Sequence, residues 1–268
     1  MNRIEQVDLA LFRTLMDGHS KFSKVFTYLE FGLLSFRHLI TIRRLMFHQH
    51  ILTRGDDETI KKVYMKQKEH HTKGDWIQML YKDFEFLQVD MDENTISSCP
   101  KEEYRKQIKK QVQGSAFKSY MQLKEQSKKK MKFLVYKDIS IQPYLSLDSF
   151  SLKEKKLLYA LRSNSYRAKM NFKKMNRGNL NCILKCFTEE TQHHIFQTCK
   201  PVLDKLKLSE IPNFSLIYGT PAEQKCAIQV FLKIDDMRKQ LQKLQDNLPP
   251  GGVDARTRAD KAANTVYL

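Results

Sequence analysis

Apolar residues recur at every third or fourth position along most of this 268-residue chain, which is the spacing of one face of an α-helix. Ile4, Val7, Leu11 and Leu15 are the first such set, and Gly18 ends it. The pattern predicts a mainly α protein with a helical bundle, and the composition adds a short polar, cysteine-bearing segment and a disordered C-terminal tail. The predicted helices cover residues 4–17, 33–52, 56–67, 76–89, 100–130, 152–170 and 220–246.

The helical spacing also predicts which side chains face inward. The inner residues of the next predicted helices are Phe36, Leu39, Ile40 and Phe47; Trp76, Leu80, Phe84 and Leu87; Ile108, Val112, Met121 and Leu123; and Ala227, Phe231, Ile234, Leu241 and Leu244. Two segments depart from the helical pattern. Residues 133–147 are expected to form an extended connector, and residues 214–218 a lone strand.

Caps and composition divide the chain further. Ser151 with Glu154 predicts a capping box, and Thr220, Pro221 and Glu223 predict the start of the last helix. We expect a helical region, a basic helical linker, a short cysteine-bearing segment, a C-terminal strand and helix, and a disordered tail. Their respective ranges are 1–92, 93–177, 178–212, 213–246 and 247–268.

The formal net charge of +17 is concentrated in two stretches. Residues 101–137 contain 12 Lys or Arg against 3 Asp or Glu, and residues 151–178 contain 9 against 1, so the remaining chain is neutral. Such asymmetry is typical of a surface that binds a polyanion, although a solvated, solubilising face gives the same pattern. The predicted nucleic-acid-binding residues are Arg43, Arg44, Lys109, Lys110, Lys128, Lys129, Lys130, Arg162, Arg167, Lys169, Lys173 and Lys174.

Several classes of protein are disfavoured by the sequence. The most apolar stretch, 31–42, is interrupted by Arg37 and His38, so we expect no membrane span. The first residues carry Arg3, Glu5 and Asp8 rather than the pattern of a secretory signal, and the five cysteines are therefore expected to stay reduced.

A metal site is predicted at Cys182, Cys186, His194 and Cys199. Three thiolates and one imidazole within 18 residues suit a closed, tetrahedral, structural zinc site, because so short a segment has little apolar material of its own. His193 competes with His194 as the ligand. The alternative is a set of buried free cysteines with an incidental histidine.

The other polar pairs are not predicted to form a catalytic site. Cys99 and Cys226 are expected to be semi-buried thiols, and His48, His50, His70 and His71 surface histidines. The neighbouring carboxylates Asp56-Asp57 and Asp235-Asp236 are expected to cap or to be solvated rather than to hold two metal ions. We therefore predict no catalytic residues.

The order of several short motifs resembles the region after the palm in reverse transcriptases of LINE-type (non-LTR) retrotransposons. The matching runs are Tyr28-Leu29-Glu30-x-Gly32, Arg43-Arg44-Leu45-Met46, His50-Ile51-Leu52-Thr53-Arg54, Lys73-Gly74-Asp75-Trp76, Ile141-Gln142-Pro143-Tyr144-Leu145, Ala160-Leu161-Arg162 and Asn171-Phe172-Lys173, followed by the four metal-site residues. The resemblance spans residues 5–245. A Cys-x3-Cys pair stands here where Cys-x2-Cys is usual in that family.

The resemblance implies a helical thumb and linker that grip template and primer, followed by a nucleic-acid-binding knuckle. The family's aromatic-Ala-Asp-Asp polymerase motif is absent from these 268 residues. We therefore expect a non-catalytic remnant that binds template RNA or DNA through basic helices and a structural Zn²⁺, with other retrotransposon-encoded domains as possible partners. We expect it inside the cell, in the nucleus or the cytoplasm, without a membrane partner. The alternatives are part of an RNA-directed DNA polymerase whose palm is supplied in trans, and a helical protein-interaction scaffold.

Overall fold

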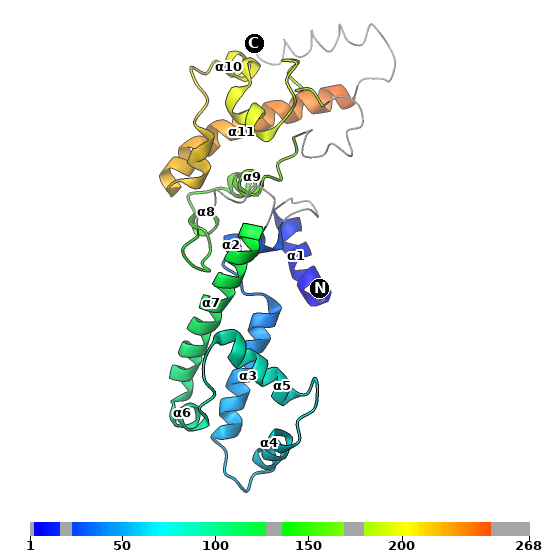
Figure 1. The fold of residues 1–268 in the computed structure, drawn as a ribbon. Helices are drawn as coiled ribbons and strands as arrows, with labels where there is room; N and C mark the ends of the chain where they lie inside the picture. The colour runs from blue at the N-terminus through cyan, green and yellow to red at the C-terminus, as the bar shows by residue number, and fades with distance from the viewer. Residues whose placement is uncertain (1–2, 17–22, 127–135, 169–179, 248–268) are drawn as a thin grey trace. The chain divides into compact units, whose positions relative to one another are not determined.

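The computed structural model describes residues 3–16, 23–126, 136–168 and 180–247, and these residues are mainly helical, as predicted (Figure 1). The only β-pairing among them is two isolated bridges, Phe31 with Ile141 and Asn181 with Glu189. The predicted tail from residue 248 onward and the predicted lysines Lys128, Lys129, Lys130, Lys169, Lys173 and Lys174 lie outside the described residues.

The chain divides into two compact units. Unit 1 contains residues 1–11 and 23–142, and unit 2 contains residues 12–22 and 143–268. The division falls inside the segment predicted as a basic linker, 93–177.

The helices of unit 1 are α2 (Lys24–Phe31), α3 (Phe36–Leu52), α4 (Thr59–Glu69), α5 (Trp76–Leu87), α6 (Glu93–Ser98) and α7 (Lys101–Gln126). The unit is built around two long helices, α3 and α7, which are accompanied by the shorter ones. Helix α3 packs against α4, α5, α6 and α7, and is the central element of the unit (Figure 1). Helix α2 was not predicted from the sequence.

Helix α1 (Arg3–Leu15) forms as predicted, but its predicted inner face is exposed. Val7, Leu11 and Leu15 are each more than half exposed, whereas Leu9 and Met16 are buried. Both sets satisfy helical spacing, so periodicity alone could not choose between them.

The inner stripe of α7 turns gradually around the helix. Its buried residues are Tyr104, Ile108, Val112, Ala116 and Tyr120, a series with a strict spacing of four. Because each such step overshoots one helical turn by about 40°, the two ends of the stripe face different neighbours. The N-terminal end joins the apolar cluster of α3 and α5, and Tyr120 stacks on Tyr28 of α2. The prediction was correct for Ile108 and Val112 and wrong for Leu123, which is exposed.

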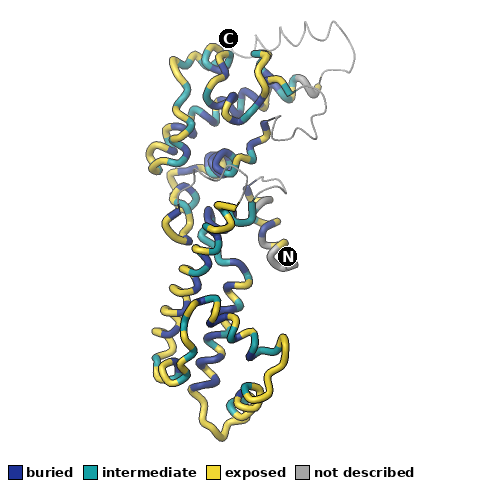
Figure 2. Tube along the Cα trace, viewed as in Figure 1, coloured by how far each residue is buried: buried dark blue, intermediate teal, exposed yellow. Residues whose placement is uncertain are grey.

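Helix α3 has buried residues along its length (Figure 2). Its buried face is largely polar, and the predicted stripe was wrong. Leu39 and Phe47 are exposed, while the buried residues include His38, Thr41, Leu45, His48, Gln49, Ile51 and Leu52. The four polar side chains are held by hydrogen bonds. Thr41 Oγ1 donates to Asp83 Oδ1 at 2.8 Å, and Gln49 Nε2 donates to the carbonyls of Ile96 and Cys99. By contrast, Leu80, Phe84 and Leu87 on α5 are buried as predicted.

Gly32 ends α2 and fixes the connector that follows α7. Its φ of 63° lies in the left-handed region, and a Cβ there would meet the Ile141 nitrogen at 2.3 Å. The Gln142 N–H donates to the Glu30 carbonyl at 2.9 Å. The close backbone approach and the positive φ together explain why glycine occupies this position.

Unit 2 contains α8 (Pro143–Ser146), α9 (Leu152–Arg162), a π-helical turn (His194–Thr198), α10 (Lys200–Leu206), a 3₁₀ helix (Phe214–Tyr218) and α11 (Pro221–Asp246). Helix α11 packs against α8, α9, α10 and the 3₁₀ helix. Ala227, Phe231, Ile234 and Leu241 are buried as predicted, and Leu244 is half-buried. The helix also buries Ile228 and Met237, which were not predicted.

Three sequence predictions in unit 2 were wrong. Residues 214–218 form a 3₁₀ helix rather than a strand, and Pro143 begins a short helix rather than continuing an extended connector. The third is the helix predicted over 152–170, because α9 ends at Arg162. Asn164 has a φ of 53° and the Ser165 N–H donates to the Ala160 carbonyl, which is a Schellman ending. Asparagine, rather than the usual glycine, supplies the left-handed residue.

In the part of the chain that the structure describes, a helix that could span a membrane by itself does not occur. Helices α2 and α3 reach the required length and composition only as a pair, which is bent by 60°.

Candidate metal centre

The first two cysteines of the cluster lie in a tight hairpin turn. The Cys182 N–H donates to the Thr188 carbonyl, and Asn181 pairs with Glu189 across the turn. Lys185 and Phe187, which flank Cys186, have φ angles of 59° and 60°. These two left-handed residues fold the chain back sharply enough to bring both thiols to one side.

The other two members of the cluster come from the π-helical turn and its end. His194 begins the turn, with its N–H bonded to Thr191 Oγ1, and Cys199 follows it as the N-cap of α10. A π-helix widens the backbone relative to an α-helix. The five-residue spacing thus places the His194 imidazole and the Cys199 thiol on the same side.

The four ligand atoms lie within 4.8 Å of one another and could hold a metal ion. Cys199 Sγ is 3.8 Å from Cys182 Sγ and 4.0 Å from Cys186 Sγ, and His194 Nε2 is 3.0 Å from Cys186 Sγ. Cys182, His194 and Cys199 are buried and Cys186 is half-buried. The predicted grouping of these four residues in space is therefore confirmed.

The two neighbouring histidines have different environments. His193 is exposed, whereas His194 is buried and directs Nε2 into the cluster. The other ring nitrogen of His194, Nδ1, lies 3.3 Å from Thr198 Oγ1. A partner on the second nitrogen fixes the orientation of a ligating imidazole, so His194 has the arrangement of a metal ligand.

The thiols interact strongly with one another. A hydrogen bond from Cys199 lowers the pKa of Cys182 to about 5. The same hydrogen bond, together with burial, raises the pKa of Cys199. Of these two thiols, Cys182 is therefore the one that more readily becomes a thiolate, the form that binds metals.

A buried carboxylate connects the cysteine turn to α11. Glu190 is fully buried; its Oε2 accepts the Ile183 N–H at 3.0 Å, and its Oε1 accepts from Arg238 at 2.5 Å. Arg238 also donates to the Arg167 carbonyl at 2.6 Å and lies over the Tyr166 ring. Sequence analysis did not identify this pair, since a Glu and an Arg 48 residues apart give no local signal.

Apolar packing supports the turn from its other side. Phe196, in the π-helical turn, is fully buried against Tyr166 and Phe231, with ring centroids 4.8 Å and 5.3 Å apart. Both contacts are edge-to-face, an arrangement that aromatic rings favour. The segment that carries the four residues is thereby held against α11 by an ion pair and by edge-to-face aromatic contacts.

The chain was compared with protein-family models, curated proteins and solved structures, and no match was found in any of the three. The resemblance to LINE-type reverse transcriptases stays a prediction.

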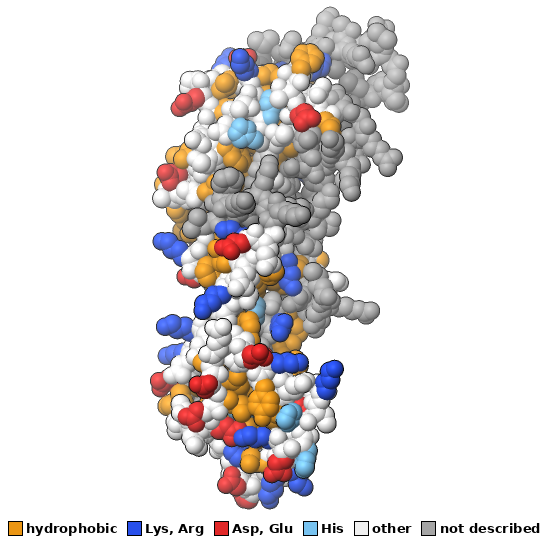
Figure 3. Space-filling view, viewed as in Figure 1, with side chains coloured by type: hydrophobic (Ala, Val, Ile, Leu, Met, Phe, Trp, Pro, Cys, Tyr) orange, Lys and Arg blue, Asp and Glu red, His pale blue; other side chains and the backbone are white. Residues whose placement is uncertain are grey.

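The predicted nucleic-acid-binding residues that are described have unequal access to solvent. Arg43, Lys109, Lys110 and Arg167 are exposed. On the face of unit 1 in Figure 3, Lys and Arg side chains are interspersed with Asp and Glu. Contact of these four residues with phosphates stays a prediction.

Two of the predicted arginines have structural roles instead. Arg162 is buried, donates to the Ile217 carbonyl at 2.8 Å and lies over the rings of Tyr144 and Tyr218. Arg44 pairs with Asp83 at 2.5 Å, and its side chain is 13% exposed. The prediction of a phosphate contact was wrong for Arg162, because a charge count does not reveal burial.

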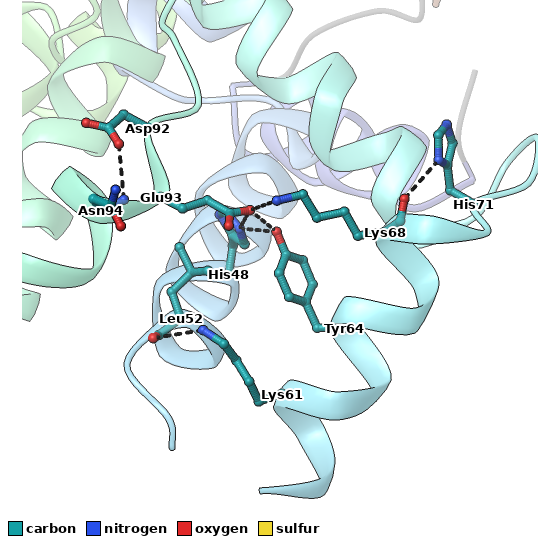
Figure 4. Close-up of polar contacts among 9 residues, drawn as sticks. All are labelled: His48, Leu52, Lys61, Tyr64, Lys68, His71, Asp92, Glu93 and Asn94. Carbon is teal, nitrogen blue, oxygen red and sulfur yellow. Dashed lines mark hydrogen bonds and ion pairs between the residues drawn. The ribbon is translucent and has the colours of Figure 1, made fainter. Parts of the chain in front are cut away.

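A second polar cluster, in unit 1, was missed by the sequence analysis (Figure 4). His48, predicted to be at the surface, is fully buried, with Nε2 3.0 Å from Tyr64 Oη. Tyr64 donates its hydroxyl to Glu93 Oε1, which also accepts from Lys68 at 2.8 Å. His48 lies three residues after Leu45 and four before Leu52, which places it in the buried stripe of α3. This spacing could have indicated from the sequence that His48 is buried.

The hydrogen-bond partners in this cluster show which ring nitrogen of His48 carries the proton. Because the one Tyr64 proton is given to Glu93, Tyr64 accepts from a protonated His48 Nε2, and His48 Nδ1 is a bare acceptor. Among the described residues Nδ1 has no hydrogen-bond partner. Burial lowers the pKa of His48 to about 4, although the Glu93 charge opposes this. Burial and the hydrogen bond to Glu93 raise the pKa of Tyr64.

The remaining sequence predictions concern single residues. Cys99 is half-buried as predicted, whereas Cys226 is exposed. Asp56 and Asp57 are exposed before α4. Asp235 is buried and accepts from Tyr166 and Lys239, so the prediction that it is solvated was wrong.

Proposed function

We propose that this chain is a non-catalytic nucleic-acid-binding protein in which a structural zinc ion, held by Cys182, Cys186, His194 and Cys199, fixes the fold of the surrounding segment. The observation that carries the proposal is the convergence of these four ligand atoms within 4.8 Å. The charge of the chain supplies the second part of the argument.

Zinc suits the cluster by chemistry and by size. With Zn–S bonds of about 2.3 Å in a tetrahedron, neighbouring sulfurs stand about 3.8 Å apart. The separations of Cys199 Sγ from Cys182 Sγ and Cys186 Sγ, 3.8 and 4.0 Å, agree with that distance. Among the common divalent ions, zinc is the one typically bound by thiolate and imidazole ligands in a tetrahedral arrangement.

A structural role follows from the number of protein ligands. Four protein ligands fill a tetrahedral site, so no position is left for the water that a catalytic zinc needs. Three of the four residues are also buried, which keeps substrates away. The zinc is therefore proposed to stabilise the turn rather than to carry out chemistry.

Nucleic acid is the partner that the charge distribution favours. The net charge is +17, and the exposed Arg43, Lys109, Lys110 and Arg167 can contact phosphates. Cations that neutralise phosphates release counterions, which drives association without sequence preference. The acidic side chains interspersed on unit 1 would moderate the affinity (Figure 3).

Metal content tests the zinc part of the proposal. We expect one zinc per full-length chain by elemental analysis after dialysis against a weak chelator. Cys186→Ser should lower the ratio, whereas Cys226→Ser should leave it at one, since Cys226 is an exposed thiol outside the cluster. A wild-type ratio near zero would remove the zinc site from the proposal.

Filter binding over a salt series tests the nucleic-acid part. If about five phosphates are neutralised, log K against log salt should have a slope near about −3.5, from about 0.7 per contact on single strands. Replacing both Lys109 and Lys110 by Glu should weaken binding to every sequence alike and flatten the slope. A salt-independent affinity would favour a protein-interaction scaffold instead.

A further inference from the structure

A groove of about 480 Å³ follows one face of helix α7 in unit 1. Leu87, the last residue of α5, lines one side of it. Helix α7 contributes the rest of the lining, Gln107, Lys110, Gln111, Gly114, Ser115 and Lys118. These six positions follow the spacing of a single helical face. The volume lies within the range of ligand sites in proteins, about 300–1,000 Å³.

The glycine in the middle of this groove is not required by the fold. Gly114 lies inside a 26-residue helix, where glycine is less favourable than any residue except proline. A Cβ at this position would meet no heavy atom of the described residues within 4 Å, in contrast to Gly32. Glycine is also used where the protein backbone closely approaches a ligand. Gly114 is exposed, so a ligand can make that approach.

The charges along the groove are all positive. Lys110 and Lys118 are exposed, and the lining contains no acidic side chain. Among the residues that the structure describes, neither lysine forms an ion pair. Glu103, one turn before the groove, accepts from Gln107 Nε2 at 3.4 Å and does not line it. The groove therefore favours an anionic ligand.

The positions of the two lysines favour a ligand with more than one negative charge. Lys110 and Lys118 stand eight residues apart, which is about 12 Å along the helix axis. An extended strand that carries a phosphate on every residue can contact both. Gln111 and Ser115 lie between them and can donate hydrogen bonds to phosphate or sugar oxygens, as uncharged polar side chains commonly do.

We propose that this groove receives the sugar–phosphate backbone of a single-stranded nucleic acid, which crosses α7 at Gly114 and places phosphates beside Lys110 and Lys118. The proposal rests on the nucleic-acid-binding function proposed above and adds a specific site to it. A side chain at position 114 would stand between the strand and the helix. Gly114 and Lys118 were not among the binding residues predicted from the sequence, because neither a glycine nor a single lysine gives a distinctive signal.

The first experiment fills the groove without changing its charge, in the variant Gly114→Leu. Because leucine is a far better helix former than glycine, the urea midpoint of unit 1, followed by the fluorescence of Trp76, should rise. The probe is a 12-nucleotide oligouridylate. Loss of two phosphate contacts should flatten the slope of log K against log salt by about 1.4 and weaken binding in 0.1 M salt by about 25-fold.

The matched control places the same side chain on the same helix outside the groove. Gln113 is exposed and does not line the groove, so Gln113→Leu should bind like the wild type. A more stable protein that binds less tightly is not the result of a structural role for Gly114. A lower urea midpoint for Gly114→Leu would overturn the argument, because the fold would then require the glycine.

A second variant leaves the glycine in place and removes one cation. Lys118→Gln should flatten the salt slope by about 0.7 and weaken binding in 0.1 M salt by about fivefold, the share of one phosphate contact on a single strand. Lys101 is exposed on the same helix and does not line the groove, so Lys101→Gln should have no such effect. Equal losses in the two lysine variants would overturn the groove as the site.

Lysine acetylation of the wild-type chain provides a test that does not depend on a substituted protein folding. Acetic anhydride is applied with and without the oligouridylate in low salt, and the modified lysines are mapped by mass spectrometry. We expect the nucleic acid to protect Lys110 and Lys118 and to leave Lys101 reactive. Protection of lysines elsewhere, with Lys110 and Lys118 fully reactive, would overturn the groove as the site.

The outcomes separate the two proposals. Salt-dependent binding that is unchanged in both Gly114→Leu and Lys118→Gln overturns the groove inference and leaves the proposed function intact. Failure of the wild type to bind the oligouridylate at any salt concentration overturns both. Equal weakening in Gly114→Leu and Gln113→Leu also overturns the groove inference, because the effect would then belong to any added leucine on α7.

Discussion

The two units bury polar groups by different means. In unit 1, the buried face of α3 carries His38, Thr41, His48 and Gln49, and each is hydrogen-bonded to side chains or carbonyls of other elements. In unit 2, the segment 180–199 has no long helix. Its three thiols and its imidazole lie close to one another, and its buried carboxylate, Glu190, pairs with Arg238. Long helices can supply many partners for a polar seam, whereas a short irregular segment needs a metal ion or an ion pair.

The sole tryptophan of the chain allows the two units to be followed separately. Trp76 packs against the apolar cluster of unit 1, so its fluorescence reports on that unit. Helices of both units contribute to far-UV circular dichroism. Agreement or disagreement between the two signals shows which unit has unfolded.

Chelation should produce the largest difference between the units. Structural zinc contributes about 10–16 kcal/mol in zinc-finger peptides at pH 7, more than many domains have in total. We expect a strong chelator to remove hydrogen-exchange protection from peptides in 180–206, with Trp76 emission unchanged. Cys186→Ser should reproduce the effect and Cys226→Ser should not. Equal loss of protection in α3 would show that the two units do not behave independently.

Removing the buried carboxylate of unit 2 should have the next largest effect. Glu190→Ala leaves Arg238 buried without its ion-pair partner, which costs about 3–5 kcal/mol. Denaturant unfolding followed by circular dichroism should show the loss, and the Trp76 transition should not move. Adding Arg238→Met should restore part of the stability, because the uncompensated charge is then gone. A double variant as unstable as the single one would contradict this account.

Acid should act on unit 1 through His48. Its pKa is lowered to about 4 in the folded state from 6.5, so the folded protein binds fewer protons than the unfolded chain. Stability is therefore full above pH 6.5 and is lost as the pH falls towards 4, by about 3 kcal/mol in total. The Trp76 transition in urea, measured at several pH values, should follow this course.

The variant His48→Met separates this group from its neighbours. It removes both the titrating imidazole and the unpaired Nδ1, so the loss of stability between pH 6.5 and pH 4 should largely disappear. Hydrogen bonds from Lys68 and Tyr64 lower the pKa of Glu93 against the effect of burial, so its contribution is lost only at the acid end of the range. An unchanged pH profile in the variant would assign the acid sensitivity to other groups.

The sequence predicted helices better than it predicted their inner faces. Spacing located α3, α5, α7 and α11 to within a few residues, because apolar residues and caps are local signals. The spacing of apolar residues indicated the wrong face of α3. The buried face carries polar side chains whose hydrogen-bond partners, such as Asp83 and Tyr64, come from other helices, and apolar periodicity does not detect such a face.

The cluster of three cysteines and one histidine was predictable because its signal is chemical. Four ligand residues close in sequence need only a turn to meet, and Cys182, Cys186, His194 and Cys199 do so. The contacts around the cluster were not predictable. Glu190 meets Arg238 only through the packing of α11, and the buried Arg162 looked in the sequence like any other surface cation.

The N-terminal caps should give the smallest effect, and each unit has one serine cap whose side chain accepts a backbone hydrogen bond, Ser23 in unit 1 and Ser151 in unit 2. Ser151 Oγ accepts the Glu154 N–H at 3.3 Å, and Glu154 Oε2 accepts the Ser151 N–H at 2.7 Å, which completes a capping box in unit 2. Ser23 Oγ accepts only the Phe26 N–H, at 3.4 Å, at the start of α2 in unit 1. Each replacement by alanine removes an acceptor from a helix N-terminus, which costs about 1 kcal/mol.

We expect Ser151→Ala to lower the stability of unit 2 by about 1 kcal/mol and Ser23→Ala to lower that of unit 1 by less, because a 3.4 Å bond is weaker and has no reciprocal partner. Glycine at either position should cost only a few tenths, since it leaves the helix end open to water. Circular dichroism should register the first change without a shift in the Trp76 transition, and the Trp76 transition should register the second. Because Glu154 also accepts from Lys225 at 2.7 Å, Ser151→Ala leaves that carboxylate in place, and a loss much above 1 kcal/mol would mean that the box also positions the ion pair.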